Sequence, residues 1–187
     1  MDEWDIRDQV EEALVAGTDV VIPRSTYLAQ VAATEGVEDE RSVLFAMGRD
    51  GADVRELELP GEGTVADLQL SDRGSLVGYL WSDAVLTETS GRASVLMTQP
   101  LRGGAPTALE VGGAAAGVVE WKFVPDASAA LLLDFDGTLL LADTAAGGEP
   151  TALGTALTID GIFRGTYTAI VERLDGVVLV DLTTGED

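Results

Sequence analysis

Residues 123–153 read FVPDASAALLLDFDGTLLLADTAAGGEPTAL, and this stretch indicates how the chain folds. Two apolar runs, residues 129–133 and residues 138–142, flank the dipeptide Asp136-Gly137. An Asp-Gly pair between two apolar runs favours the positive φ angles of a type I′ hairpin turn. The stretch therefore predicts a β-hairpin.

Turn signals on both sides of this hairpin predict two further strands. Residues 118–124, VVEWKFV, supply a further strand ahead of Pro125-Asp126, and residues 147–150, Gly-Gly-Glu-Pro, break the chain before residues 151–153. Gly and Pro at such places end one strand before the next begins. We therefore expect four short antiparallel strands, a unit of the kind that repeats in propeller folds.

Parts of this unit recur elsewhere in the chain. Residues 103–109, GGAPTAL, match residues 147–153, GGEPTAL, at six of seven positions, 44 residues apart. Residues 174–181, LDGVVLVD, repeat the Asp-Gly and apolar strand of residues 135–143, but without a carboxylate two residues upstream. Because the Asp-Gly recurs without its partner carboxylate, we interpret it as a turn former.

The apolar pattern divides the chain into a helix and four blade-like units. Residues 1–17 are expected to form an amphipathic helix, because Ile6, Val10, Ala13 and Leu14 recur at helical spacing. Residues 18–187 are expected to form an all-β domain of about four antiparallel, four-stranded blades. Their approximate limits are 18–61, 64–112, 117–155 and 157–187.

The same central stretch also carries a possible catalytic motif. Residues 131–140, LLLDFDGTLL, locally resemble the signature of the haloacid dehalogenase family. The resemblance implies that Asp134 is a phosphoryl-accepting nucleophile, that Asp136 is the general acid/base, and that the pair binds Mg²⁺. That mechanism also needs a Lys and further acidic ligands from helix-flanked parallel strands downstream. No Lys follows the motif, since Lys122 is the only one in the chain, so we keep the phosphohydrolase only as the alternative.

A second resemblance covers more of the chain. Phe123, Pro125-Asp126, Asp143, Gly147-Gly148 and Pro150 stand where the repeat phrase of TolB-like and WD-type β-propellers puts them, with Leu153 after them and Ala127 replacing a turn Gly. Residues 65–182 resemble that family. The resemblance implies a rigid platform for interactions and brings no catalytic residues. Such propellers usually have more blades, so a closed four-bladed ring, a partial ring completed by association, and a fragment of a longer protein all remain open.

Composition narrows the functional classes further. The chain has no Cys and no His, which excludes thiolate catalysis and removes the commonest general base and zinc ligand. Its 33 acidic residues against 11 basic ones give a net charge of −22, which would repel nucleic acid. We expect no cofactor, and no metal site because no Asp-x-Asp-x-Asp loop occurs. The N-terminus is acidic and no long apolar run occurs, so we expect neither a signal peptide nor a membrane span. This predicts a cytoplasmic protein, or a secreted or periplasmic one if the chain is a fragment.

Two places are candidates for contact with a partner. The first is the inserted loop at residues 82–92, where Trp81, Asp83, Glu88 and Arg92 are candidate binding residues on the rim, although Trp81 and Trp121 also suit a packing role. The second is the last blade, which has no fourth strand and leaves an edge from Val177 to Leu182. We expect this edge to pair with a protein partner or with another copy of the chain. The sequence therefore predicts a non-enzymatic interaction or scaffolding module.

Overall fold

The computed structural model describes residues 26–34, 40–48, 55–61, 63–72, 75–83, 94–109, 117–145, 148–163 and 165–186. These residues form fourteen β-strands and no helix, and every strand pairing is antiparallel. The expected all-β architecture is confirmed. The expected N-terminal helix, residues 1–17, and the start of the first expected blade, residues 18–25, lie outside the described residues.

The strands form four separate sheets that follow one another along the chain. The first sheet is β1 (Thr26–Thr34), β2 (Glu40–Gly48) and β3 (Arg55–Leu57). The second sheet is β4 (Gly63–Leu70), β5 (Leu76–Asp83), β6 (Val95–Pro100) and β7 (Thr107–Leu109). The third sheet is β8 (Val118–Phe123), β9 (Ala129–Asp134), β10 (Thr138–Asp143) and β11 (Thr151–Thr155). The fourth sheet is β12 (Thr158–Ile162), β13 (Thr168–Arg173) and β14 (Gly176–Asp181).

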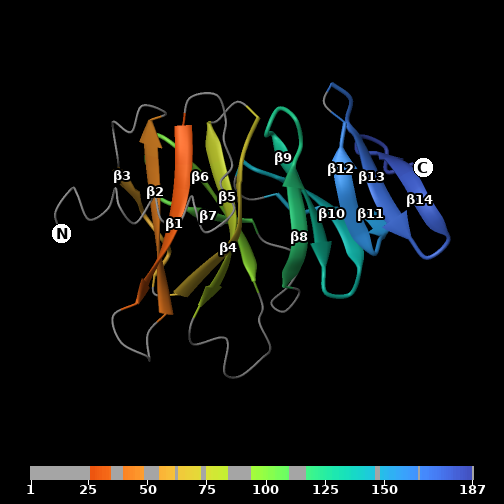
Figure 1. The fold of residues 1–187 in the computed structure, drawn as a ribbon. Helices are drawn as coiled ribbons and strands as arrows, with labels where there is room; N and C mark the ends of the chain where they lie inside the picture. The colour runs from red at the N-terminus through yellow and green to blue at the C-terminus, as the bar shows by residue number, and fades with distance from the viewer. Residues whose placement is uncertain are drawn as a thin grey trace.

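The four sheets stand side by side in chain order, with their faces toward one another (Figure 1). Three apolar clusters fill the spaces between neighbouring sheets. One joins the first and second sheets, one the second and third, and one the third and fourth. Among the described residues no cluster joins the first sheet to the fourth, so the array does not close into a ring.

The same hydrogen bond closes the first hairpin of three sheets. Ser71, Val124 and Phe163 each donate their backbone N–H, at 3.0 Å, to the carbonyl oxygen of the residue that opens the next strand. Those acceptors are Leu76 in the second sheet, Ala129 in the third and Thr168 in the fourth. The three sheets are thus structural repeats, and these acceptors define equivalent positions in them.

The Asp-Gly turns differ from the expected type. A type I′ turn needs positive φ at both central residues, whereas at the β9–β10 turn only Gly137 has positive φ, at 77°. The Gly137 N–H donates to the Asp134 carbonyl oxygen at 3.1 Å, with Phe135 and Asp136 at the centre of the turn. This is the pattern of a type I turn followed by a left-handed glycine, so the prediction of a type I′ turn was wrong. Ala127, where a turn Gly was expected, does have positive φ, at 60°.

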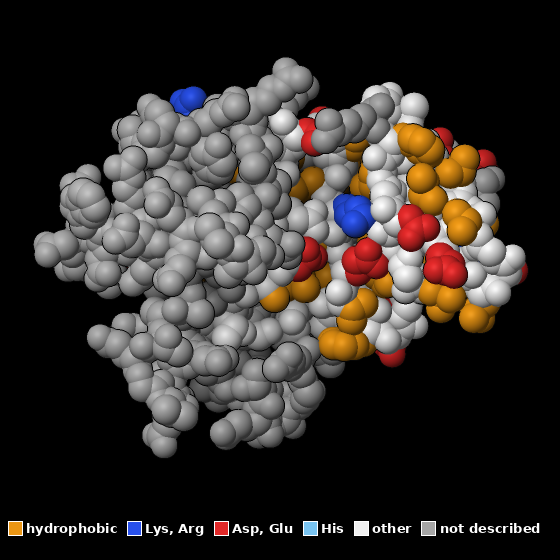
Figure 2. Space-filling view, viewed as in Figure 1, with side chains coloured by type: hydrophobic (Ala, Val, Ile, Leu, Met, Phe, Trp, Pro, Cys, Tyr) orange, Lys and Arg blue, Asp and Glu red, His pale blue; other side chains and the backbone are white. Residues whose placement is uncertain are grey.

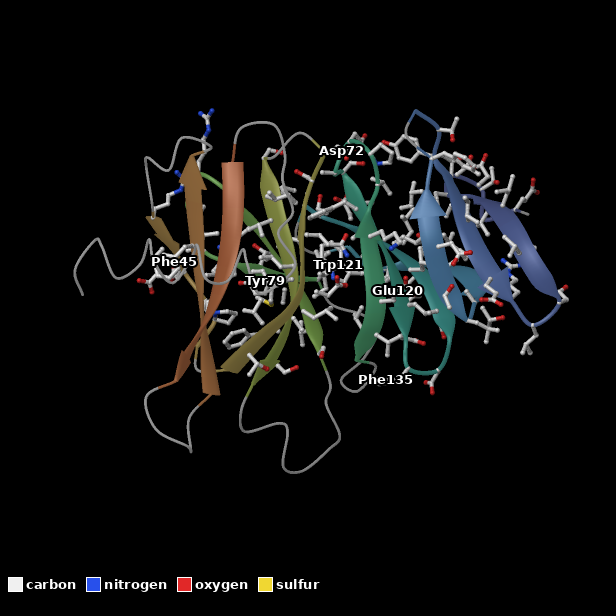
Figure 3. All side chains as sticks on the ribbon, in the orientation of Figure 1. Phe45, Asp72, Tyr79, Glu120, Trp121 and Phe135 are labelled. Atoms are coloured by element: carbon white, nitrogen blue, oxygen red, sulfur yellow. The ribbon has the colours of Figure 1, made fainter. Side chains whose placement is uncertain are left out.

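Trp121 is the largest side chain in the apolar cluster between the second and third sheets. Its side chain is 0% exposed and meets Phe123 edge-on, with ring centroids 4.9 Å apart. Figure 3 shows Trp121 between the strands of these two sheets. Gly78 in β5 (Leu76–Asp83) makes room for it, because a Cβ there would lie 2.4 Å from the Trp121 ring.

Polar groups also connect the first strands of neighbouring sheets. The Gln69 amide Nε2 donates to the Trp121 carbonyl oxygen at 2.9 Å, and the Glu120 carboxylate accepts the Ile159 N–H at 2.9 Å. These bonds fix β4 against β8 and β8 against β12.

No helix of the described residues is long and apolar enough to cross a membrane.

We predict that Gly78→Ala lowers the free energy of unfolding by about 1–3 kcal/mol, because the new methyl group must displace the Trp121 ring. At about 2–4 °C per kcal/mol for a chain of this size, the melting temperature falls measurably in a thermal denaturation experiment. Gly161→Ala is the matched control, because a Cβ at this other strand glycine meets nothing within 4 Å. Equal effects of the two substitutions would contradict the packing role of Trp121.

Candidate functional site

Asp134, the candidate nucleophile, holds the hairpin turn. It ends β9, and its side chain is 7% exposed. Its Oδ1 accepts the backbone N–H of Asp136 at 2.9 Å and that of Thr138 at 2.7 Å. A carboxylate that accepts hydrogen bonds from two turn N–H groups has a structural role, which explains the residue without a catalytic function.

The surroundings of this pair differ from those that the phosphohydrolase alternative requires. Asp136 is exposed on the turn, and both aspartates belong to an antiparallel hairpin, not to a parallel sheet covered by helices. In the described part of the chain, no group of three or more acidic side chains could hold a metal ion. The structure thus brings Asp134 and Asp136 together without the further acidic ligands of that mechanism.

The rim candidates are only partly placed. Trp81 is 7% exposed and belongs to the cluster between the first and second sheets, where Gly63 lies against its ring. Trp81 therefore packs in the core and does not present its ring on the rim. Asp83 ends β5, although its side chain is not described, and Glu88 and Arg92 lie outside the described residues.

The fourth sheet has one covered face and one exposed face. Ala169, Val171 and Val180 point toward the third sheet and are 0% exposed. Side chains alternate between the two faces along a strand, so Ile170, Glu172, Val177 and Leu179 share the other face. We call these four residues the far face.

The repeat shows what the far face corresponds to. The hairpin hydrogen bonds make Thr168, Ala129 and Leu76 equivalent, so the residues four positions later are equivalent too. The strand partners of those later residues are Val177 in the fourth sheet, Leu139 in the third and Leu96 in the second. Leu139 and Leu96 are both 0% exposed, whereas Val177 is 63% exposed. A position that is buried in two sheets is thus open in the fourth.

Other large apolar side chains are exposed in the same part of the molecule. Leu179 is 52% exposed, and Leu174, in the turn between β13 and β14, is 93% exposed. Figure 2 shows hydrophobic side chains gathered with acidic ones over the end of the molecule formed by the fourth sheet. The sequence predicted the edge of this sheet but missed the far face, because alignment on the Asp-Gly pairs sets Val177 against Thr138. Only the strand pairing matches Val177 to the buried Leu139.

A hydrogen bond joins the loops of the third and fourth sheets. The Tyr167 hydroxyl donates to the Asp126 carboxylate, and Asp126 also accepts the Ser128 N–H at 3.0 Å and the Ser128 hydroxyl at 2.7 Å. The Tyr167 bond, followed by the two from Ser128, lowers the pKa of Asp126 to about 2. Asp126 thus acts as a turn former, as expected, and also as a link between sheets.

Comparison with solved structures supports the β-propeller fold. The chain is similar to the β-propeller domain of the Trilobed protease from Pyrococcus furiosus, with an open velcro topology, at a TM-score of 0.60 and 12% identity. It is also similar to a structure from an analysis of two prolyl endopeptidases, at a TM-score of 0.59 and 13% identity. The matches cover 82% and 91% of this chain, but only 47% and 31% of those chains. No protein-family model and no curated protein sequence matches the chain.

We predict that Tyr167→Phe raises the pKa of Asp126 toward the ordinary aspartate value of about 4, because the largest stabilising bond to its carboxylate is lost. A lowered pKa stabilises the fold above about pH 4, and this contribution disappears as the pH falls toward 2. Stability should therefore fall less between pH 4 and 2 in the variant than in the wild type. NMR titration of the carboxyl carbons measures the shift.

Asp181 provides an internal control for this titration. Its pKa is lowered by the Thr183 hydroxyl and backbone, with no contribution from the Tyr167 hydroxyl, and should not change. If the Asp126 midpoint also stays unchanged in Tyr167→Phe, the link between the two loops is absent in solution.

Proposed function

We propose that the chain is a non-enzymatic protein-interaction or scaffolding module built on a partial β-propeller. The observation that carries this proposal is the far face, where Val177 is 63% and Leu179 is 52% exposed although the equivalent Leu139 is fully buried. Contiguous apolar surface of this kind commonly marks a site of protein association. The partner is a protein or a second copy of the chain, bound near the predicted edge from Val177 to Leu182. Within that range it would use Val177 to Leu179, because Asp181 and Leu182 are hydrogen bonded within the chain.

The energy available at this face supports association. Complete burial of a Val or Leu side chain contributes about 1.5–3 kcal/mol. Val177 and Leu179 on the far face, with Leu174 in the adjacent β13–β14 turn, therefore offer several kcal/mol before the entropic cost of binding is subtracted. This amount suits weak or moderate binding, and further contacts would strengthen it.

Charge restricts the partner. Glu172 lies on the far face, and Asp175, Asp181 and Glu186 are exposed near it. Added to the net charge of −22, these carboxylates disfavour an acidic partner. An apolar surface with neutral or basic flanks matches this face best.

The phosphohydrolase hypothesis has weaker support than the interaction module. Its motif is present, but the Asp134 carboxylate is engaged by the turn N–H groups of Asp136 and Thr138. In our proposal Asp134 is a structural residue. The resemblance to TolB-like propellers agrees with this, because it implies an interaction platform.

We predict that the isolated chain associates at high protein concentration and that Val177→Asp weakens this association, because a carboxylate on the far face must be desolvated on binding. Light scattering measures the mass against the monomer value of 19.5 kDa. Phe135→Asp is the matched control, since Phe135 is 59% exposed but lies on the β9–β10 turn (Figure 3). Association that both substitutions weaken equally would remove the far face as its cause.

We also predict that the chain does not hydrolyse p-nitrophenyl phosphate in the presence of Mg²⁺. Asp134→Ala should lower the free energy of unfolding by about 1–3 kcal/mol, because two turn N–H groups lose their acceptor. Asp134→Asn keeps a carbonyl acceptor and should cost less. Mg²⁺-dependent turnover that Asp134→Asn abolishes at an unchanged melting temperature would instead establish the phosphohydrolase.

A further inference from the structure

Three sheets of the chain are completed by the same kind of short strand. β3 (Arg55–Leu57), β7 (Thr107–Leu109) and the start of β11 (Thr151–Thr155) each place a leucine at their third residue. These leucines, Leu57, Leu109 and Leu153, are 3%, 4% and 6% exposed. Each belongs to a cluster that fills the space beside its own sheet.

The register is also repeated in two of these strands, β3 and β7. Leu109 pairs with Leu96, and Leu57 pairs with Leu44. In β11 a bulge shifts the pattern, so that Thr151 pairs with Leu141 and Gly154 with Leu139. Leu44, Leu96 and Leu139 are all 0% exposed, whereas their counterpart in the fourth sheet, Val177, is open. The short strand with its leucine is thus the element that the fourth sheet lacks among the described residues.

Within the described part of the chain, the outer edge of the β14 backbone has no strand partner at the matching positions. Leu182 N–H donates to Tyr167 on the β13 side, and Asp181 N–H donates the other way, to the Glu186 carbonyl oxygen. Successive residues of a strand direct their backbone groups to opposite edges, so Leu179 and Val177 face the outer edge with Asp181. Among the described residues, no strand pairs with that edge.

The chain's own final turn limits how far this edge is open. Gly185 N–H donates to the Asp181 carbonyl oxygen, and Gly185 lies against Leu153 of the third sheet. The turn therefore occupies the edge at Asp181. Val177, Val178 and Leu179 remain, and their equivalents Leu96, Met97 and Thr98 are the three residues that β7 covers.

We propose that the edge of β14 from Val177 to Leu179 binds an extended segment of another polypeptide with the pattern Thr-Ala-Leu. The segment adds as an antiparallel fourth strand, with threonine opposite Leu179, alanine opposite Val178 and leucine opposite Val177. This inference rests on the proposed interaction function and specifies its ligand.

Each feature of the ligand follows from an internal counterpart. Residues on opposite positions of an antiparallel pair share a face, so the leucine covers Val177 on the far face as Leu109 covers Leu96. The alanine tolerates many side chains, because Ala108 and Ala152 are exposed. Glu172 lies opposite Val177 on β13, so an acidic residue in place of the leucine would be repelled.

The chain contains a probe for this site. The peptide with the sequence of residues 103–109, GGAPTAL, acetylated and amidated, is uncharged and ends on the required pattern. In an NMR titration of the full chain, we expect saturable shifts and slower amide exchange at Val177 and Leu179, whose N–H groups become hydrogen bonded. A control peptide with Asp in place of the final Leu should bind at least tenfold more weakly.

Protein variants test the register. Leu179→Pro removes an N–H that points to the outer edge and should raise the dissociation constant at least tenfold, whereas Leu179→Ala keeps this donor and should have a smaller effect. Val177→Asp provides a second test in case the proline variant does not fold. Val177 lies at a surface position that tolerates the change, and the new carboxylate should also prevent binding. Phe135→Asp should bind the peptide as the wild type does.

The outcomes separate this inference from the proposed function. Peptide binding that is lost in Val177→Asp and kept in Phe135→Asp supports the site. No binding at millimolar peptide, or binding that does not depend on Val177 and Leu179, overturns it. If the chain still associates through the far face in that case, the interaction function stands and only the strand ligand is wrong.

Discussion

Sheet-on-sheet packing is the constraint on which this structure depends. Each sheet is a single layer with two faces, so it is stable when neighbouring sheets cover the apolar side chains on both faces. The second and third sheets satisfy this condition, and the fit is tight enough that Gly78 must lack a side chain where Trp121 packs. The fourth sheet meets it on one face only, and the exposed Val177 and Leu179 follow from that.

The same constraint explains why polar groups lie where they do. Gln69 and Glu120 reach across to the backbone of the next sheet, and Tyr167 reaches the Asp126 turn. These bonds satisfy backbone and side-chain groups at the margins of the apolar clusters, where an unpaired group would be costly. They also fix the order of the sheets, because each bond joins sheets that are neighbours in the chain.

The Asp134-Phe135-Asp136-Gly137-Thr138 segment shows how a short motif can have two meanings. In an α/β fold such a segment would place two carboxylates at the end of a parallel strand, beside a phosphate site. In this antiparallel hairpin the first carboxylate accepts two backbone N–H groups, and the glycine takes the left-handed conformation. The surrounding strands, and not the five residues themselves, therefore decide what Asp134 does.

The sequence by itself determined the strands, their antiparallel order and the position of the unfilled edge, because alternating apolar residues and Gly, Pro and Asp-Gly turns act locally. It also identified Asp126 and Asp136 as turn residues. Only the tertiary structure decided that Trp81 is buried, that Tyr167 meets Asp126 and that the Asp-Gly turn is not type I′. The tertiary structure also decided that Val177 is exposed, at a position where Leu96 and Leu139 are buried. Such features depend on which sheet lies against which face, and residues distant in the sequence set that arrangement.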